Sequence, residues 1–167
     1  MRDDGRSEPG ERLIGREEES ARLRVSLRDH RVVFVHGAAG VGKTALVREA
    51  CQEAARDREL PAVVHVSLAG AEGAREALER SARAIGAGRP STPPDRVGEA
   101  LVALLAHHPR TLVWDDVDDR VAPLVEAASR LARTEGAARL VIVSRRALSA
   151  REAALRAPVL ELGPLSP

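Results

Sequence analysis

The sequence predicts an α/β fold in which a parallel sheet of about five strands lies between two layers of helices. Segments of consecutive apolar and β-branched residues alternate along the 167-residue chain with segments that have helical apolar spacing. This alternation is typical of a parallel sheet whose connecting helices cover both of its faces. A glycine-rich turn also joins the first apolar segment directly to a helix, which makes that junction the first place to look for a ligand site.

Strands are expected where every position is apolar, as in residues 32–35, because such runs fit burial on both faces. Helices are expected where apolar residues recur every three or four positions, and Glu17, Glu18 and Glu19 suit the positive end of the first helix. The expected strands are residues 31–36, 61–68, 111–114, 139–143 and 159–162. The expected helices are residues 15–28, 43–56, 74–85, 95–107 with Asp95 as a plausible N-cap, 121–134 and 147–156.

Length and composition fit one globular domain, with 44% hydrophobic and 31% charged residues. Residues 1–12 are rich in Gly, Pro, Ser and charged residues and are expected to be a flexible lead-in to a domain at residues 13–167. A formal net charge of +1 gives no reason to expect nucleic acid or a membrane as a partner. The single cysteine, Cys51, favours a reducing, cytoplasmic location.

Residues 37–44 match the pattern G-x-x-x-x-G-K-[ST] in full, between a buried strand and an amphipathic helix. Glycines let backbone N–H groups turn toward phosphate oxygens, and the helix N-terminus adds partial positive charge. The pattern predicts that Lys43, the only lysine of the chain, reaches the β- and γ-phosphates and that the Thr44 hydroxyl ligates Mg²⁺. The expected nucleotide-binding residues of this loop are Gly37, Ala38, Ala39, Gly40, Val41, Gly42, Lys43 and Thr44.

Two carboxylates, Asp115 and Asp116, follow the apolar strand 111–114. After a phosphate-binding loop, such a pair is expected to hold Mg²⁺ through Asp115 and to orient or deprotonate the attacking water through Asp116. The alternative is that acidic residues merely end a strand. Asp118 and Asp119 fit helix capping equally well. Arg145, after strand 139–143, is expected to stabilise charge on the transferred phosphate, or else to be one of many solvent-facing arginines.

Taken together, these motifs resemble the STAND class of P-loop ATPases, whose members include NB-ARC domains and the ATPase domains of large LuxR-type regulators. The residues Leu13-Ile14-Gly15-Arg16-Glu17-Glu18-Glu19 resemble the entry motif of that class, and 37–44 resembles its Walker A motif. Residues 112–119 resemble its Walker B motif with a doubled aspartate. Residues 140–145 resemble its sensor strand, and 160–166 resemble its strand leading into a Pro-Leu-Ser turn.

The resemblance implies a sheet order of 5-1-4-3-2, an ATP/ADP-binding site with Mg²⁺, and contacts of Leu13, Ile14, Gly15 and Arg16 with adenine and ribose. It also implies that Arg145 senses the γ-phosphate and that ATP promotes self-association. In the family, a helical and a winged-helix domain follow this core and close over the nucleotide, so a lid is expected in trans or in a longer relative. The preference for ATP over GTP rests on the resemblance alone.

The function expected first is a switch ATPase of a signalling or transcriptional regulator that hydrolyses ATP slowly with Mg²⁺. One alternative is a nucleotide-binding scaffold without useful catalysis. Another is an AAA+ type ATPase acting on DNA, because related entry motifs occur in replication initiators. The near-zero net charge and the lack of a basic stripe argue against DNA as a partner of this domain.

Overall fold

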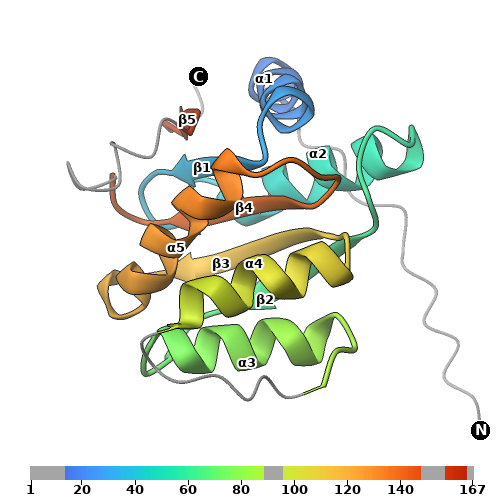
Figure 1. Cartoon of the computed structure of the whole chain (residues 1–167). Coiled ribbons are helices and arrows are strands. Elements are labelled where there is room, and N and C mark those ends of the chain that lie inside the picture. Colours follow the sequence, from blue (N-terminus) through green and yellow to red (C-terminus); the bar gives the residue numbers. More distant parts are fainter. Residues whose placement is uncertain (1–13, 89–95, 148–156, 165–167) are drawn as a thin grey trace, which may run out of the picture.

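The computed structural model describes residues 14–88, 96–147 and 157–164. Within these residues one five-stranded sheet has the order β2-β3-β4-β1-β5, and every pair of neighbouring strands is parallel (Figure 1). Read from the other edge, this is the order 5-1-4-3-2, so the expected topology and fold class are confirmed. Because β4 lies between β1 and β3, the loops that follow these three strands meet at one edge of the sheet.

The strands are β1 (Val32–His36), β2 (Val63–Ser67), β3 (Thr111–Val117), β4 (Arg139–Ser144) and β5 (Val159–Glu161). The helices are α1 (Glu17–Asp29), α2 (Lys43–Arg56), α3 (Ala74–Ala84), α4 (Val97–His107) and α5 (Ala122–Arg133), with a 3₁₀ turn at Asp119–Val121. Most expected bounds agree within two residues. The suggested cap at Asp95 and the expected helix at 147–156 lie almost wholly outside the described residues.

Strand β3 differs most from its expected bounds, because it continues through both aspartates to Val117. Its pairing with β4 shifts register between Trp114 and Val117, and Asp116 there has φ of 56°. An irregularity of this kind bends a strand and re-aims its side chains. The expectation that the strand ends at Trp114 is therefore wrong, since Asp115 and Asp116 belong to an irregular last part of the strand.

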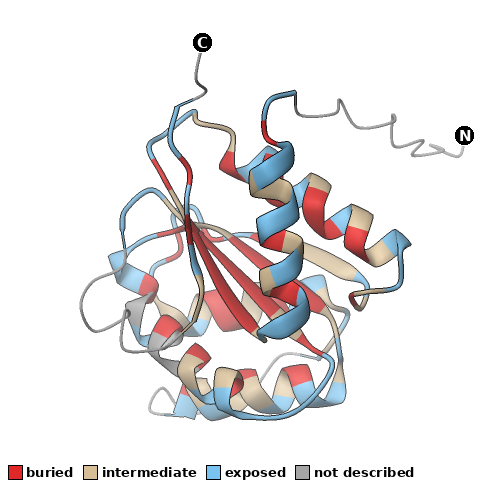
Figure 2. Ribbon diagram, turned by 90° about the horizontal axis from the view of Figure 1, so that it is seen from above, coloured by how far each residue is buried: buried red, intermediate tan, exposed pale blue. Residues whose placement is uncertain are grey.

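Helices α1 and α2 cover one face of the sheet, and α3, α4 and α5 cover the other (Figures 1 and 2). Alternate residues of one strand serve the two apolar cores, as Val33 and Val35 pack with α1 and α2 while Phe34 packs on the opposite side. All three side chains are at most 1% exposed. Burial on both faces explains why β1, β3 and β4 are continuous apolar runs.

The indole of Trp114 is the largest fully buried side chain among the described residues, and it lies in the core on the α3 side of the sheet with Phe34. Its N–H donates to the Ser81 hydroxyl at 2.9 Å, and that hydroxyl donates to the carbonyl of Ala77 at 2.8 Å. Trp114 and Ser81 are fully buried. The indole N–H and the Ser81 hydroxyl both have partners, so these hydrogen bonds offset the cost of burying them, and the tryptophan fixes β3 against α3.

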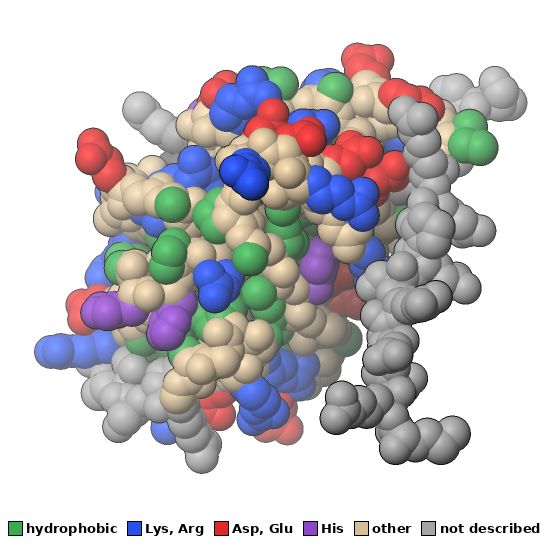
Figure 3. Space-filling model, turned by 90° about the vertical axis from the view of Figure 1, so that its right-hand side faces the viewer, with side chains coloured by type: hydrophobic (Ala, Val, Ile, Leu, Met, Phe, Trp, Pro, Cys, Tyr) green, Lys and Arg blue, Asp and Glu red, His purple; other side chains and the backbone are tan. Residues whose placement is uncertain are grey.

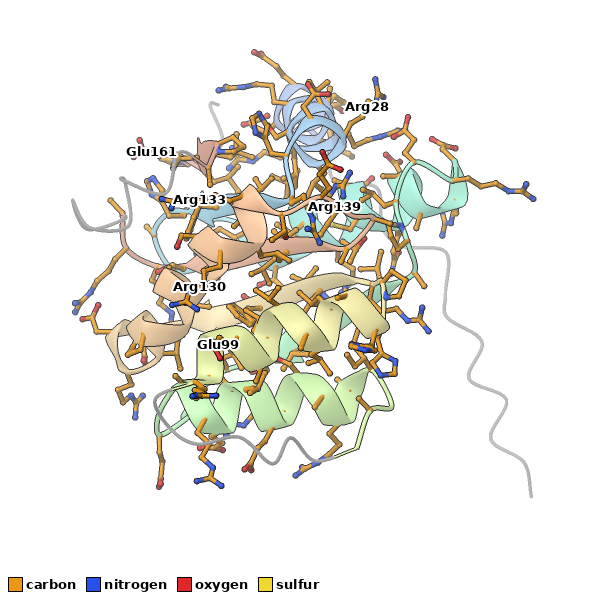
Figure 4. All side chains as sticks on the ribbon, viewed as in Figure 1. Arg28, Glu99, Arg130, Arg133, Arg139 and Glu161 are labelled. Carbon is orange, nitrogen blue, oxygen red and sulfur yellow. The ribbon has the colours of Figure 1, made fainter. Side chains whose placement is uncertain are left out.

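Arg139 lies at the amino end of β4, at the end of the strands opposite to loop 37–44 (Figure 4). Its guanidinium donates to the carbonyls of Leu27 at 2.8 Å and Ala137 at 2.9 Å. Burial lowers the pKa of Arg139, which is the expected effect of taking a cation out of water. These bonds join the end of α1 to the start of β4, at the far end of the strands from loop 37–44 and the last part of β3.

Candidate functional site

The glycine-rich loop 37–44 leaves the carboxyl end of β1 and runs directly into α2. Gly40 and Gly42 have φ of 79° and 92°, a conformation that is costly for residues with a Cβ. Gly42 is also the N-cap of α2, so the first N–H groups of that helix face the same space as the loop. Such N–H groups, with the helix dipole behind them, form a site for an anion.

Lys43 lies inside this loop with only 9% of its surface exposed. Its Nζ donates to the carbonyls of Gly37 and Ala38, both at 2.8 Å. Burial lowers the pKa of Lys43, and the charge of Asp115 opposes that effect. The ammonium group is thus partly desolvated, and a nearby anion would stabilise its charged form.

Thr44 and Asp115 meet although they are 71 residues apart, with the hydroxyl donating to Oδ2 of the carboxylate at 2.7 Å. The other carboxylate oxygen of Asp115 accepts the backbone N–H of Asp116 at 2.9 Å. A hydroxyl beside a carboxylate suits Mg²⁺, which keeps several waters and takes few protein ligands when phosphate supplies others. Among the described residues, no group of three or more His, Cys, Asp or Glu side chains is arranged so that it could hold a metal ion.

Asp116 carries the second carboxylate of the site in a left-handed backbone conformation. Its Oδ1 accepts a hydrogen bond from Nη2 of Arg145 at 3.2 Å, which joins the end of β3 to the residue after β4. Both side chains are well exposed, with 40% and 67% of their surface accessible, so the ion pair is readily exchanged for other partners. The structure therefore brings together the four residues for which a catalytic role was expected: Lys43, Asp115, Asp116 and Arg145.

A cavity of about 710 Å³ opens beside Asp116 at this edge of the sheet. It lies on the side of α5 and contains none of the residues of loop 37–44. The residues that line the cavity are Phe34, Ala69, Gly70, 116–120, Val125, Ile142 and 144–147.

Asp118 and Asp119 have different partners. Asp118 accepts the backbone N–H of Arg120 at 2.9 Å, as a residue that caps the 3₁₀ turn does, whereas Asp119 pairs with Arg146 at 2.9 Å.

The entry motif reaches the loop through Arg16, whose side chain donates to the carbonyls of Val41 at 3.3 Å and Gly163 at 2.6 Å. Arg16 is 4% exposed, whereas Ile14 is 86% exposed. Gly15 turns the chain between them with φ of 81°. Leu13 lies outside the described residues. The motif is therefore adjacent to loop 37–44 in space, with its arginine buried and its isoleucine in solvent.

The segment after β5 also contacts loop 37–44, which sequence reasoning did not foresee. The N–H of Leu162 donates to the carbonyl of His36 at 2.7 Å. A Cβ added to Gly37 would lie 2.3 Å from the carbonyl oxygen of Leu162. The first glycine of the loop is thus required by a backbone contact as well as by any ligand. The only sign of this contact in the sequence was the glycine that opens the phosphate-loop pattern, and that glycine did not show which residue would lie against it.

The sheet order and the loop between β1 and α2 define the core of a P-loop NTPase. A family model described as AAA ATPase domain matches residues 12–160. The chain belongs to this family and is therefore an ATPase domain. No curated protein matches the chain.

Several solved structures are similar to this chain. Cdc6p from Pyrobaculum aerophilum has 20% identity and a TM-score of 0.71, over 95% of this chain and 48% of that one. The ORC1 protein of Aeropyrum pernix, solved in complex with DNA, has 23% identity and a TM-score of 0.66, over 92% and 46%. The A. pernix ORC2 protein, in ADPNP and ADP complexes, has 19% identity and a TM-score of 0.64, over 96% and 50%.

At these identities the likeness establishes the fold, and the chain spans about half the length of each of these proteins. The expectation that nucleic acid is an unlikely partner of this domain is not supported by these comparisons. Among the described residues, no helix has the length and apolar character needed to cross a lipid bilayer.

We predict that Gly37→Ala destabilises the protein by about 1–3 kcal/mol, the usual cost of forcing a group into a packed site. The added Cβ would press on the backbone of Leu162, which cannot move without breaking its bond to His36. Urea unfolding followed by Trp114 fluorescence measures the change. Gly163→Ala is the matched control, since its added Cβ meets no atom within 4 Å. Equal stability of the two variants would refute the close contact at Gly37.

Proposed function

We propose that the chain is an ATP/ADP-binding switch module with slow, Mg²⁺-dependent ATP hydrolysis. The observation that carries the proposal is the convergence of loop 37–44, the Thr44–Asp115 pair and the Asp116–Arg145 pair at one edge of the sheet. Each group has the chemistry that phosphoryl transfer needs, namely N–H donors and a lysine for phosphate, oxygens for a cation, and a carboxylate for water.

In this proposal the N–H groups of loop 37–44 and the Nζ of Lys43 bind the β- and γ-phosphates, and Lys43 exchanges its bonds to Gly37 and Ala38 for phosphate oxygens. Thr44 and Asp115 hold Mg²⁺, which neutralises charge on the phosphates when it is bound. Asp116 orients the attacking water and accepts its proton as the bond between the β–γ bridging oxygen and the γ-phosphorus breaks. ADP and inorganic phosphate are the products.

Arg145 is proposed to leave Asp116 and bind the γ-phosphate, so that the ion pair marks the nucleotide-free state. Exchange of one partner for another at an exposed ion pair costs little, which suits a switch. The ordered motifs that resemble STAND proteins support a role in a signalling or transcriptional regulator that self-associates when ATP is bound. Sedimentation of the chain with a non-hydrolysable ATP analogue and with ADP tests this, and identical sedimentation in both would refute it.

A second candidate is an AAA+ type ATPase acting on DNA, favoured by the AAA ATPase domain match over residues 12–160. The net charge of +1 supplies little general attraction to phosphates. The face in Figure 3 carries basic and acidic side chains side by side instead of a basic stripe. Salt-dependent binding of duplex DNA in the presence of ATP would establish this candidate in place of a signalling switch.

Nucleotide binding is expected to raise the thermal stability of the wild-type protein and not that of Lys43→Ala. A ligand at about 100 times its Kd stabilises by roughly 2.7 kcal/mol, which is several degrees for a domain of this size. Differential scanning fluorimetry with Mg²⁺-ATP, Mg²⁺-ADP and Mg²⁺-GTP measures the shift. Arg48→Ala, an exposed change on the same helix, should keep it. A shift that survives in Lys43→Ala would refute phosphate binding by loop 37–44.

Asp116→Asn is expected to lower single-turnover phosphate release by about 10²–10⁴-fold, the usual contribution of a general base. The Kd for ATP should change little, because Asp116 lies outside the phosphate-binding loop. Asp119→Asn serves as the control, since it pairs with Arg146 and lies three residues further along the chain. Unchanged release in Asp116→Asn would exclude it as the base. No release from the wild type, with ATP bound, would leave a non-hydrolysing scaffold.

A further inference from the structure

We infer that Arg16 is a positioning residue that fixes loop 37–44 through the backbone of Val41, and that its guanidinium does not contact the base or ribose. The inference rests on the proposed function, because the position of the loop matters only if the loop binds phosphate. It replaces the nucleotide contact that the entry motif implies for this side chain with a role inside the protein.

The guanidinium of Arg16 is bonded to other groups of the protein. Nη1 donates to Oε1 of Glu19 at 2.8 Å, and Nη2 donates to the carbonyls of Gly163 at 2.6 Å and Val41 at 3.3 Å. The side chain is 5% exposed, and that of Glu19 is 25% exposed. A guanidinium has five N–H donors in a fixed plane, and here that plane faces acceptors of the protein itself. Three of the five donors are thus used within the protein, and with 5% of the side chain exposed little of the guanidinium is open to a ribose or base.

Val41, an acceptor of Arg16, lies at the point where the loop becomes α2. It precedes Gly42, the N-cap of α2, and Lys43, so the bond from Arg16 holds the loop where it becomes helix. The Val41 side chain also packs close to Gly37, 3.2 Å from the position of an added Cβ. A shift of the Val41 backbone would therefore move the N–H groups and the lysine that are expected to meet phosphate.

Gly163, another acceptor of Arg16, belongs to the segment that follows β5. The preceding residue, Leu162, donates to the carbonyl of His36 at the end of β1, and its own carbonyl lies against Gly37, the first residue of the loop. Gly163 is bonded through Arg16 to Val41 near the end of the loop. The segment after β5 thus contacts both ends of loop 37–44, once directly and once through the guanidinium. Arg16 couples the path of the chain beyond β5 to the geometry of the loop, and no contact with nucleotide is needed for that coupling.

Two readouts test the inference. In nucleotide-free protein, Arg16→Gln should speed amide hydrogen exchange within residues 38–44, because the bond to Val41 is lost. The variant should also weaken binding of Mg²⁺-ATP and of Mg²⁺-tripolyphosphate, which has no base or ribose, by a similar factor of about 10–100, as removal of a supporting residue does at other sites. Calorimetric titration at a temperature where all variants are folded measures the binding. Arg16→Lys should recover part of the loss.

Three variants serve as controls. Arg22→Gln removes an exposed arginine from the same helix and should change neither readout. Arg139→Gln loosens the opposite edge of the sheet, so it separates general destabilisation from an effect at the loop. Glu19→Gln keeps Arg16 and removes its carboxylate partner, and it should show a smaller change in the same direction. It also keeps the test decisive if Arg16→Gln does not fold.

The outcomes separate this inference from the function on which it rests. If Arg16→Gln weakened the binding of ATP and not that of tripolyphosphate, Arg16 would contact the base or ribose, and the inference would be overturned. A wild type that binds ATP and not tripolyphosphate would also overturn it. Unchanged exchange and binding in the Arg16 and Glu19 variants would also overturn it. A folded wild type that binds neither ligand would instead refute the proposed nucleotide site, and the inference with it.

Discussion

The hydrogen bond between the Thr44 hydroxyl and the Asp115 carboxylate is the contact on which the site depends, because it joins the loop after β1 to the end of β3. These two strands are not neighbours, since β4 lies between them. The bond is possible because all three strands are parallel, so that their carboxyl ends lie at the same end of the sheet. Sheet order, the irregularity and the glycine loop together place a hydroxyl beside a carboxylate.

The edge strand β5 and the start of α1 support that arrangement from the other side of β1. Leu162 bonds to His36, the last residue of β1 before the loop, and Arg16 bonds to Val41 near the end of the loop. The catalytic chemistry proposed for the loop thus relies on residues that would not touch nucleotide. The apolar cores on the two faces of the sheet fix the strands, while the polar groups of the site lie at the carboxyl ends of the strands and at the start of α2.

The fold could be predicted from the sequence, as could the residues that lie together at the candidate site, for identifiable reasons. Apolar runs located the strands, the glycine pattern located the loop, and a family resemblance supplied the order 5-1-4-3-2. The course of β3 past Trp114 was mispredicted, since a left-handed Asp116 leaves no mark in an apolar pattern. The burial of Arg16 was equally invisible, because its acceptor Gly163 is 147 residues away and is a backbone carbonyl.

The most direct test of the account is a double-mutant cycle on Mg²⁺-dependent ATP affinity, using Thr44→Val and Asp115→Asn. If the two side chains share one cation, each single change should weaken ATP binding in the presence of Mg²⁺. The double variant should then bind ATP nearly as well as the single variant with the lower affinity. In excess EDTA the variants should bind ATP nearly as the wild type does. Fully additive losses, or losses that persist without Mg²⁺, would contradict a shared cation site formed by Thr44 and Asp115.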